Sequence, residues 1–215
     1  MQDQEKALQV PVWKRCLDCA CIAVGLPLIA PIFCLIAIYI KLVSPGPAFF
    51  RQARVGFQGR PFECYKFRTM RVGADTGLHQ NHLQELITSD KPMTKMDKKG
   101  DPRLIPGALL LRASGLDELP QLINILRGEM SICGPRPCTP YEFEKYQAWH
   151  RERFDTLPGL TGLWQVNGKN RTTFSEMIRL DITYVRQKCL TLDLKIMFKT
   201  FAALADQIRE TKKKT

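Results

Sequence analysis

The N-terminal part of the chain contains one long segment without charge. Residues 19 to 40, CACIAVGLPLIAPIFCLIAIYI, would form a straight helix of about 33 Å, which is long enough to cross the hydrocarbon core of a bilayer. Pro27 and Pro31 stand four residues apart in its middle, and Gly25 precedes them. Because each proline removes a backbone donor and crowds the preceding turn, the pattern predicts a sharp bend between two half-helices.

The charges that flank this segment bear on its topology. Lys14 and Arg15 precede it, and Lys41, Arg51 and Arg54 follow it. Basic residues favour the cytoplasmic side of a membrane, so both ends of the segment favour the same side. A re-entrant helix-break-helix, which enters and leaves on the cytoplasmic face, satisfies both the charges and the prolines. A single crossing is the alternative.

A short β-hairpin follows the membrane segment. The Pro- and Gly-rich residues 44 to 47 break the helix, and two strands are predicted over residues 48 to 54 and 61 to 69. Alternation along the second strand puts Lys66 and Arg68 on one face. Such a pair can clamp a phosphate, although for the strand taken alone a solvated face is the better explanation.

The rest of the chain is predicted to be mostly helical. Residues 73 to 103 are polar and predict a loop, with room for a short helix near His82 to Ile87. Further elements follow from helical spacing and from breakers: a helix that begins close to Asp117 and ends at Arg127-Gly128, a charged helix over 140–153, a loop over 158–162, and helices over 173–187 and 191–209. The sequence therefore predicts an α+β, mostly helical monotopic protein, with a membrane element over 1–43 and a folded domain over 44–215.

Composition points to an anionic partner. The 32 Lys and Arg residues outnumber the 21 Asp and Glu residues by 11. Such an excess attracts nucleic acid, acidic lipid headgroups or phosphorylated substrates, or it is simply a solvated basic surface. Basic stretches interleaved with aromatic residues, as in RNA-binding domains, are missing, so nucleic acid is not expected as a partner.

The eight cysteines do not form a disulfide or zinc framework. Cys16 and Cys19 have C-x-x-C spacing, but no second pair completes a metal site. We expect buried, reduced thiols, which places the folded domain in the cytoplasm.

Candidate chemistry centres on two adjacent acids. Asp117 and Glu118 stand where a helix is predicted to begin, a position at which an Asp is most often a simple cap. The same position allows an acid to bind a divalent cation or to attack phosphorus. Four basic residues can supply the cationic surround that a diphosphate requires: Lys66, Arg68, Arg112 and Arg136.

Seven segments, in order between Trp13 and Leu204, carry a resemblance to a known family. They are KRCLD at 14–18, YKFRTM at 65–70, LRASGLDELPQL at 111–122, RGEMSICGPRP at 127–137, LPGLTGLWQVNGK at 157–169, RLDITYV at 179–185 and LDLKIM at 192–197. With these the chain resembles the bacterial sugar transferases, the small monotopic polyprenyl-phosphate phosphoglycosyl transferases. It departs from their pattern at Ala30, where the family usually has Ser before the bend proline.

The resemblance implies a reaction and a location. Family members transfer a sugar 1-phosphate from a UDP-sugar to polyprenyl (undecaprenyl) phosphate and release UMP. This step initiates lipid-linked glycan assembly, as in exopolysaccharide, capsule or O-antigen synthesis. It takes place at the bacterial inner membrane, with the catalytic domain on the cytoplasmic face among membrane lipids. A homodimer is an expectation from family analogy alone.

The resemblance also implies roles for single residues. Asp117 is the nucleophile that forms a phosphosugar-aspartyl intermediate, and Glu118 completes the catalytic dyad. Mg²⁺ is held partly by Asp117 and partly by the diphosphate. The positions matched to substrate binding are Arg112 and Arg136, near the phosphate, and Lys66, Asp181 and Asp193, whose parts are less defined.

Two other functions have to be weighed against this one. A non-catalytic basic domain that binds anionic lipid or nucleic acid explains the charge and the apolar segment, but it leaves the Asp117-Glu118 pair without a purpose. A glycosyl transferase that moves only the sugar releases UDP in place of UMP. The sequence does not separate glucose, galactose and N-acetylated sugars as substrates.

Overall fold

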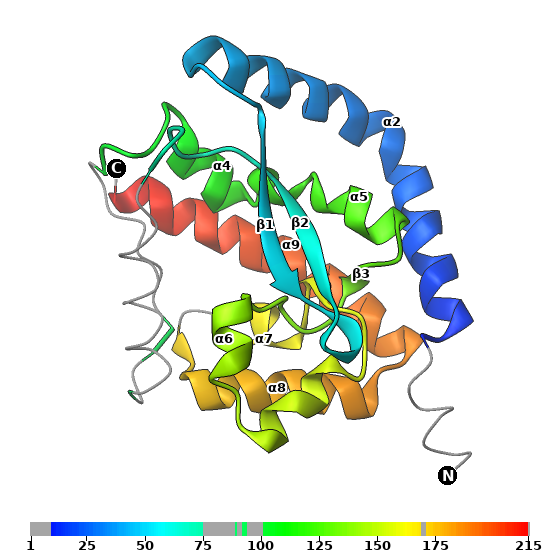
Figure 1. The fold of residues 1–215 in the computed structure, drawn as a ribbon. Helices are drawn as coiled ribbons and strands as arrows, with labels where there is room; N and C mark the ends of the chain where they lie inside the picture. Colours follow the sequence, from blue (N-terminus) through cyan, green and yellow to red (C-terminus); the bar gives the residue numbers. More distant parts are fainter. Residues whose placement is uncertain (1–9, 75–88, 90–91, 94–100, 169–170, 215) are drawn as a thin grey trace.

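The computed structural model describes residues 10–74, 89, 92–93, 101–168 and 171–214. They form an α+β fold that is mostly helical, as the sequence predicted, with two small two-stranded sheets. One long helix, α2, passes along one side and over the top of the other elements, and the hairpin β1–β2 and the helices α4, α5 and α9 lie beneath it (Figure 1). The short helix predicted near His82 to Ile87 lies outside the described residues.

Helix α2 runs without interruption from Val12 to Val43 and contains both prolines, Pro27 and Pro31. The predicted division into two half-helices is therefore wrong. The helix instead changes direction along its length (Figure 1). Each proline lacks the N–H that would bond four residues back, so the bend costs single hydrogen bonds without ending the helix.

The start of α2 is held inside the folded domain. Lys14 is fully buried, and its Nζ donates to Asp193 Oδ2 at 2.6 Å and to the Tyr184 hydroxyl at 2.7 Å. One turn later, Asp18 Oδ1 accepts a hydrogen bond from the Ser131 hydroxyl at 3.0 Å. The first turns of α2 therefore belong to the core of the domain.

The other end of α2 is held by the hairpin. Arg68 Nε donates to the Pro47 carbonyl at 2.6 Å, and its two terminal nitrogens donate to the hydroxyl and carbonyl oxygens of Ser44 at 2.9 and 2.8 Å. Ile40 is fully buried among apolar residues that include Phe67. The Arg68 guanidinium therefore binds the residues that follow the C-terminal end of α2. Arg68 and Lys66 do not form the predicted phosphate clamp, because each binds a different protein group.

The hairpin matches its prediction to within one or two residues at each end. Strands β1 (Phe49–Val55) and β2 (Pro61–Phe67) pair antiparallel, around the 3₁₀ turn η1 (Phe57–Gly59). Phe33 of α2 packs its ring against Phe49 and Phe67, with centroids 5.6 and 4.8 Å apart. The hairpin is thus bound to the membrane helix by packing as well as by Arg68.

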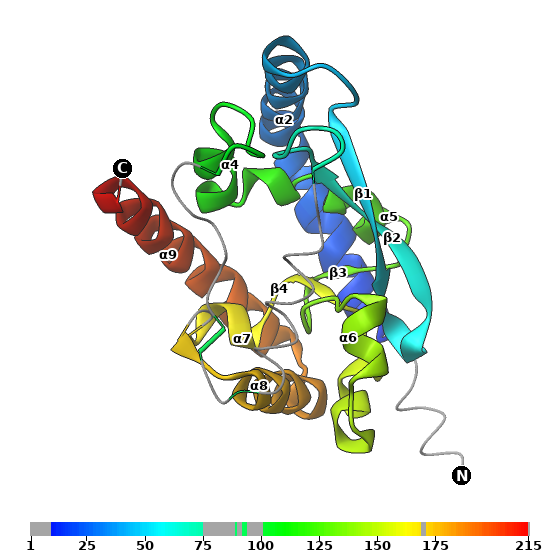
Figure 2. The ribbon, with the colours of Figure 1, turned by 60° about the vertical axis from the view of Figure 1, so that its left-hand side comes forward.

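The remaining elements follow in order: α4 (Ala108–Ser114), η2 (Leu116–Glu118), α5 (Gln121–Leu126), β3 (Ser131–Cys133), α6 (Pro140–Glu144), η3 (Ala148–Phe154), β4 (Gly159–Thr161), α7 (Leu163–Val166), α8 (Phe174–Gln187) and α9 (Leu190–Lys214). The helices predicted over 173–187 and 191–209 are confirmed as α8 and α9, α9 being longer than expected. Strands β3 and β4 pair in parallel, in the middle of the molecule near α9 (Figure 2).

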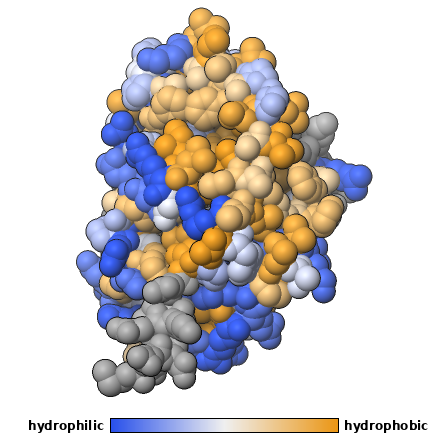
Figure 3. All heavy atoms as spheres, turned by 90° about the vertical axis from the view of Figure 1, so that its right-hand side faces the viewer, coloured by the Kyte–Doolittle hydropathy of each residue, from blue (hydrophilic) through white to orange (hydrophobic). Residues whose placement is uncertain are grey.

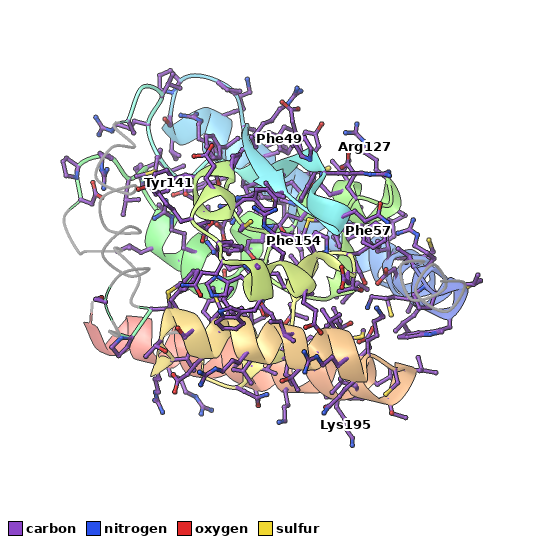
Figure 4. All side chains as sticks on the ribbon, turned by 60° about the horizontal axis from the view of Figure 1, so that its bottom comes forward. Phe49, Phe57, Arg127, Tyr141, Phe154 and Lys195 are labelled. Carbon is purple, nitrogen blue, oxygen red and sulfur yellow. The ribbon has the colours of Figure 1, made fainter. Side chains whose placement is uncertain are left out.

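Two predictions fail between residues 140 and 162. The single helix expected over 140–153 is two pieces, α6 and η3, because the chain is extended at Gln147, whose N–H donates to His150 Nδ1 at 3.1 Å. Tyr146 and Phe154, on either side of this break, both lie in the core with residues of α8. Phe154 is labelled in Figure 4. The loop expected over 158–162 contains β4, a strand too short to show any periodicity.

The thiols are free, as expected, but only some are buried. All eight cysteines are unpaired. Cys64, Cys133 and Cys138 are buried, whereas Cys16, Cys19, Cys34 and Cys189 are exposed. Three of the exposed thiols lie on α2.

The middle of α2 exposes apolar side chains to the outside. Val24, Leu28, Leu35 and Leu42 are 83%, 71%, 66% and 81% exposed. Hydrophobic residues gather on the side of the molecule that α2 covers (Figure 3). By length and composition α2 is the one helix among the described residues that is apolar enough to cross a membrane. An apolar surface of this extent indicates contact with lipid or with another protein.

Replacing Lys14 with Met tests the anchoring of α2. The change leaves Asp193 buried without its cation, so we expect a loss of about 3–5 kcal/mol in the free energy of unfolding. The paired variant Lys14→Met/Asp193→Asn removes both charges and should recover much of this loss. The midpoint of thermal unfolding in detergent micelles measures both. Equal midpoints for wild type and Lys14→Met would contradict the anchoring.

Candidate active site

The two adjacent acids lie on a short turn between two helices. Gly115 ends α4 in the left-handed conformation, with φ 71°, and the chain then enters the 3₁₀ turn η2. Asp117 is buried to 9% exposure. The N–H of Glu118 already donates to the Gly115 carbonyl at 3.0 Å, and α5 begins only after Pro120, which has no N–H. The acids therefore lie before the helix, not at a helix end with free donors.

Lys66 lies directly beside this turn. Its Nζ donates to Glu118 Oε1 at 2.7 Å, which joins β2 to η2. Both side chains are partly exposed, at 24% and 38%, so the pair adds little stability by itself. The pair matters for the site because it places the ammonium of Lys66 next to the predicted dyad of Asp117 and Glu118.

Arg112 lies in the last turn of α4, and its side chain contacts the segment that follows the hairpin. Its Nε donates to Thr69 Oγ1 at 2.9 Å. The nearby Arg103 binds Asp101 at 2.7 Å, and hydrogen bonds from Arg103, with a smaller contribution from Arg112, lower the pKa of Asp101 to about 2. Asp101 is therefore ionised at neutral pH and paired with Arg103.

Arg136 is bound to a buried carboxylate. Its Nη1 donates to Glu142 Oε1 at 3.2 Å, and Glu142 is fully buried. The other carboxylate oxygen of Glu142 accepts from the Thr139 N–H, within a capping box at the start of α6, and lies 3.8 Å from Arg54 Nη1. Burial alone would raise the pKa of Glu142, but Arg136 and Arg54 outweigh it and the pKa is lowered.

The thiol of Cys64 is buried on β2, two residues before Lys66, and burial raises its pKa. Direct contacts join the predicted site residues in two sets. Lys66 binds Glu118, next to Asp117 on the turn, and Arg136 binds Glu142, which also lies near Arg54. The structure thus brings Lys66 to the Asp-Glu turn and places Arg136 in an ion cluster with Glu142 and Arg54.

Asp181 and Asp193 are placed differently from the prediction. Asp181 is fully buried in an ion pair with Arg153, and burial raises the pKa of Asp181 to about 6. Asp193 is 1% exposed and paired with Lys14. Both carboxylates bind protein groups inside the fold, as Arg68 does at the end of α2. For these three residues the structure supports a structural role in place of direct substrate contact.

Sequence reasoning missed three residues of this region. Arg54 had been counted only as a charge flanking the membrane segment, and Glu142 and Arg153 as surface charges of a helix. The sequence T-P-Y-E at 139–142 has the spacing of a capping box, and this signal would have placed Glu142 at a helix start. Nothing local in the sequence indicates that its carboxylate meets two arginines.

The described residues contain no group of three or more His, Cys, Asp or Glu side chains placed to hold a metal ion. Asp117 and Glu118 are adjacent, so at most these two carboxylates are available on the turn. Mg²⁺ is commonly bound by one or two carboxylates together with substrate phosphates. The donor set fits a cation that binds together with a diphosphate.

Comparison with known proteins agrees with these features. The family model described as "Bacterial sugar transferase" matches residues 9–207. The exopolysaccharide production protein ExoY of Rhizobium meliloti is 38% identical, over 89% of this chain and 84% of its own. The UDP-glucose:undecaprenyl-phosphate glucose-1-phosphate transferase of Caulobacter vibrioides is 41% identical, over 91% and 70%.

A third relative is longer. The undecaprenyl-phosphate galactose phosphotransferase of Salmonella typhimurium is 37% identical over 87% of this chain, which covers 39% of that protein. The similarity in all three spans the hairpin, the Asp-Glu turn and α8. The chain belongs to the bacterial sugar transferase family.

Proposed function

We propose that this protein transfers a sugar 1-phosphate from a UDP-sugar to undecaprenyl phosphate and releases UMP, the first step in building an exopolysaccharide or related glycan. The observation that carries the proposal is the acidic turn of Asp117 and Glu118, with Asp117 buried and Lys66 bound to Glu118 at 2.7 Å. The names of the relatives support the substrates, and both glucose and galactose occur among them.

The proposed reaction has two displacement steps at one phosphorus. A carboxylate oxygen of Asp117 attacks the sugar-bound phosphorus, the bond to the bridging oxygen breaks, and UMP leaves with that oxygen. A phosphate oxygen of undecaprenyl phosphate then attacks the same phosphorus and releases the Asp117 carboxylate. No proton has to be transferred in either step. Catalysis therefore depends on position and on neutralising charge.

The basic residues supply that neutralisation. Lys66 is bound to the turn, and Arg112 is directed from α4 toward the end of the hairpin. Arg136, whose side chain is 31% exposed, would add a further positive charge. Glu118 holds Lys66 at 2.7 Å and so fixes the ammonium beside Asp117. Asp117 is where Mg²⁺ would bind together with the diphosphate. When bound, the cation would offset negative charge on the phosphate oxygens.

The proposal includes a re-entrant membrane helix on the cytoplasmic face of the inner membrane. Both ends of α2 are attached to the same folded domain, through Lys14 at the start and Ser44 at the end. A crossing would separate these attachments by the hydrocarbon core, about 30 Å thick. The bend in α2 and its exposed apolar residues support a helix that dips into one leaflet and returns (Figures 1 and 3).

A non-catalytic basic membrane domain is the competing function. It accounts for the charge and for α2, but it gives no reason for a buried Asp117 next to a Glu118 held by lysine. Release of UMP from a UDP-sugar separates the two. The same assay across UDP-glucose, UDP-galactose and N-acetylated UDP-sugars identifies the sugar.

The reaction should be ping-pong. Purified protein mixed with its UDP-sugar alone should release up to one equivalent of UMP and gain the mass of a sugar phosphate on the peptide that carries Asp117. Asp117→Asn should give neither, while Asp155→Asn, at the end of η3, should match wild type. UMP that appears only after undecaprenyl phosphate is added would favour a ternary complex over the covalent route.

Removing divalent cations should suppress the first step. We expect a chelator to abolish the UMP burst and added Mg²⁺ to restore it, because the diphosphate loses its counter-charge. Circular dichroism should not change, since the described residues hold no structural metal cluster. An undiminished burst in the chelator would mean that the basic residues suffice.

Both ends of α2 should lie on one side of the membrane. Single cysteines at Val12 and at Lys195, in a cysteine-free variant, can be treated with an impermeant thiol reagent in intact spheroplasts. Val12 is 78% exposed, and Lys195 projects outward from α9 (Figure 4). Both should react only after lysis. Labelling at position 12 before lysis would show that α2 spans the bilayer.

A further inference from the structure

Arg54 is an arginine held inside the protein behind the proposed active site. It is 6% exposed and lies near the end of β1. Its Nη1 donates to the Pro137 carbonyl at 3.0 Å and its Nη2 to Gln52 Oε1 at 2.6 Å. Its Nε is buried and has no hydrogen-bond partner among the described residues. Placing a guanidinium here is costly unless it serves a purpose, because desolvation penalises the charge.

The charges around Arg54 do not balance. Glu142 lies 3.2 Å from Arg136 and 3.8 Å from Arg54, so one carboxylate serves two guanidinium groups. The neighbouring Arg153 has its own carboxylate in Asp181. The three-residue cluster of Arg54, Glu142 and Arg136 therefore carries one uncompensated positive charge.

This excess charge can reach solvent at only one member of the cluster. The side chains of Arg54 and Glu142 are 7% and 1% exposed, whereas that of Arg136 is 31% exposed. The backbone also fixes Arg136, since Arg153 Nη2 donates to its carbonyl at 2.7 Å. An anion that approaches the cluster therefore meets Arg136.

We propose that Arg54 is a positioning residue, which competes with Arg136 for Glu142 and so leaves Arg136 with positive charge for the diphosphate of the substrate. With Arg54 absent, Glu142 would neutralise Arg136 and hold its guanidinium away from the anion. With Arg54 present, the cluster is preorganised, because it carries its positive charge before the substrate arrives. The assignment of the anion as a UDP-sugar rests on the proposed function, but the charge sharing does not.

A purely structural cluster makes a different prediction. If Arg54 only joins β1 to the segment after β3, its loss lowers stability and leaves anion affinity unchanged. The two roles separate when charge is removed in matched steps. Arg54→Met takes the net charge of the cluster from one to zero, and Arg54→Met/Glu142→Gln returns it to one without restoring the Arg54 side chain.

The first measurement is binding of inorganic pyrophosphate to the detergent-solubilised protein, by isothermal titration calorimetry. We expect Arg54→Met to weaken binding about tenfold, the order expected for one partly screened charge. The double variant should bind within about threefold of wild type, and Arg54→Lys should also retain binding because it keeps the charge. The exposed pair of Arg186 and Glu152 provides the control, as Arg186→Met and Arg186→Met/Glu152→Gln. Neither control should change binding.

The second measurement is steady-state kinetics with the UDP-sugar. Arg54→Met should raise KM more than it lowers kcat, and the double variant should reverse the increase. If Arg54→Met does not fold, wild type, Arg54→Lys and the double variant still test the proposal. Pyrophosphate affinity that stays at the wild-type value in Arg54→Met, or that falls equally in the double variant, would overturn it.

The two proposals fail in different ways. Binding of pyrophosphate requires no turnover, so charge-dependent binding without any release of UMP would count against the proposed reaction and leave the role of Arg54 standing. Normal turnover with no effect of Arg54→Met on pyrophosphate binding or on KM would support the proposed reaction and count against the role of Arg54.

Discussion

The buried ion pair of Lys14 and Asp193 fixes the relation between the membrane helix and the catalytic domain. Both side chains are withdrawn from water, and each offsets the cost of burying the other. Because Lys14 lies in the first turn of α2 and Asp193 in the first turn of α9, the pair joins the two longest helices. The apolar remainder of α2 is thereby directed along one face of the domain, where its other end meets the hairpin. Both ends of α2 are thus attached to the rest of the fold.

The proposed site depends on paired charges as well, at 2.7 Å for Lys66 with Glu118 and 3.2 Å for Arg136 with Glu142. Lys66 with Glu118 joins strand β2 to the Asp-Glu turn, and Glu142 joins Arg136 to Arg54 of β1. The side chains of Lys66, Glu118 and Arg136 are partly exposed, whereas that of Glu142 is buried. The basic groups can therefore meet a ligand from solvent, and Glu142 holds Arg136 from inside the protein. Such an arrangement suits a reaction that consists of exchanging phosphate groups and transfers no proton.

Local patterns in the sequence predicted the elements that are long or strongly marked. The apolar run of α2, the hairpin with its glycine-flanked turn, and the amphipathic helices α8 and α9 all follow from periodicity and breakers. The pairing of Arg68 with Ser44, of Asp181 with Arg153 and of Asp193 with Lys14 could not be predicted, because each joins residues that only the tertiary fold brings together. The family resemblance therefore assigns both acids to substrate binding, and the alternation of the strand does the same for Arg68, although each binds a protein group.

In the proposed reaction, strand β2 would set the distance between the Asp-Glu turn and the membrane. Arg68 holds the point where α2 ends, and Lys66, two residues earlier, holds the catalytic turn, so the two contacts are separated by about 7 Å of extended chain. A lipid phosphate lies at the same level as the end of a helix that leaves the hydrocarbon. An undecaprenyl phosphate would then reach the turn without being lifted out of the headgroup layer, and its long apolar tail would stay dissolved in the membrane throughout the transfer.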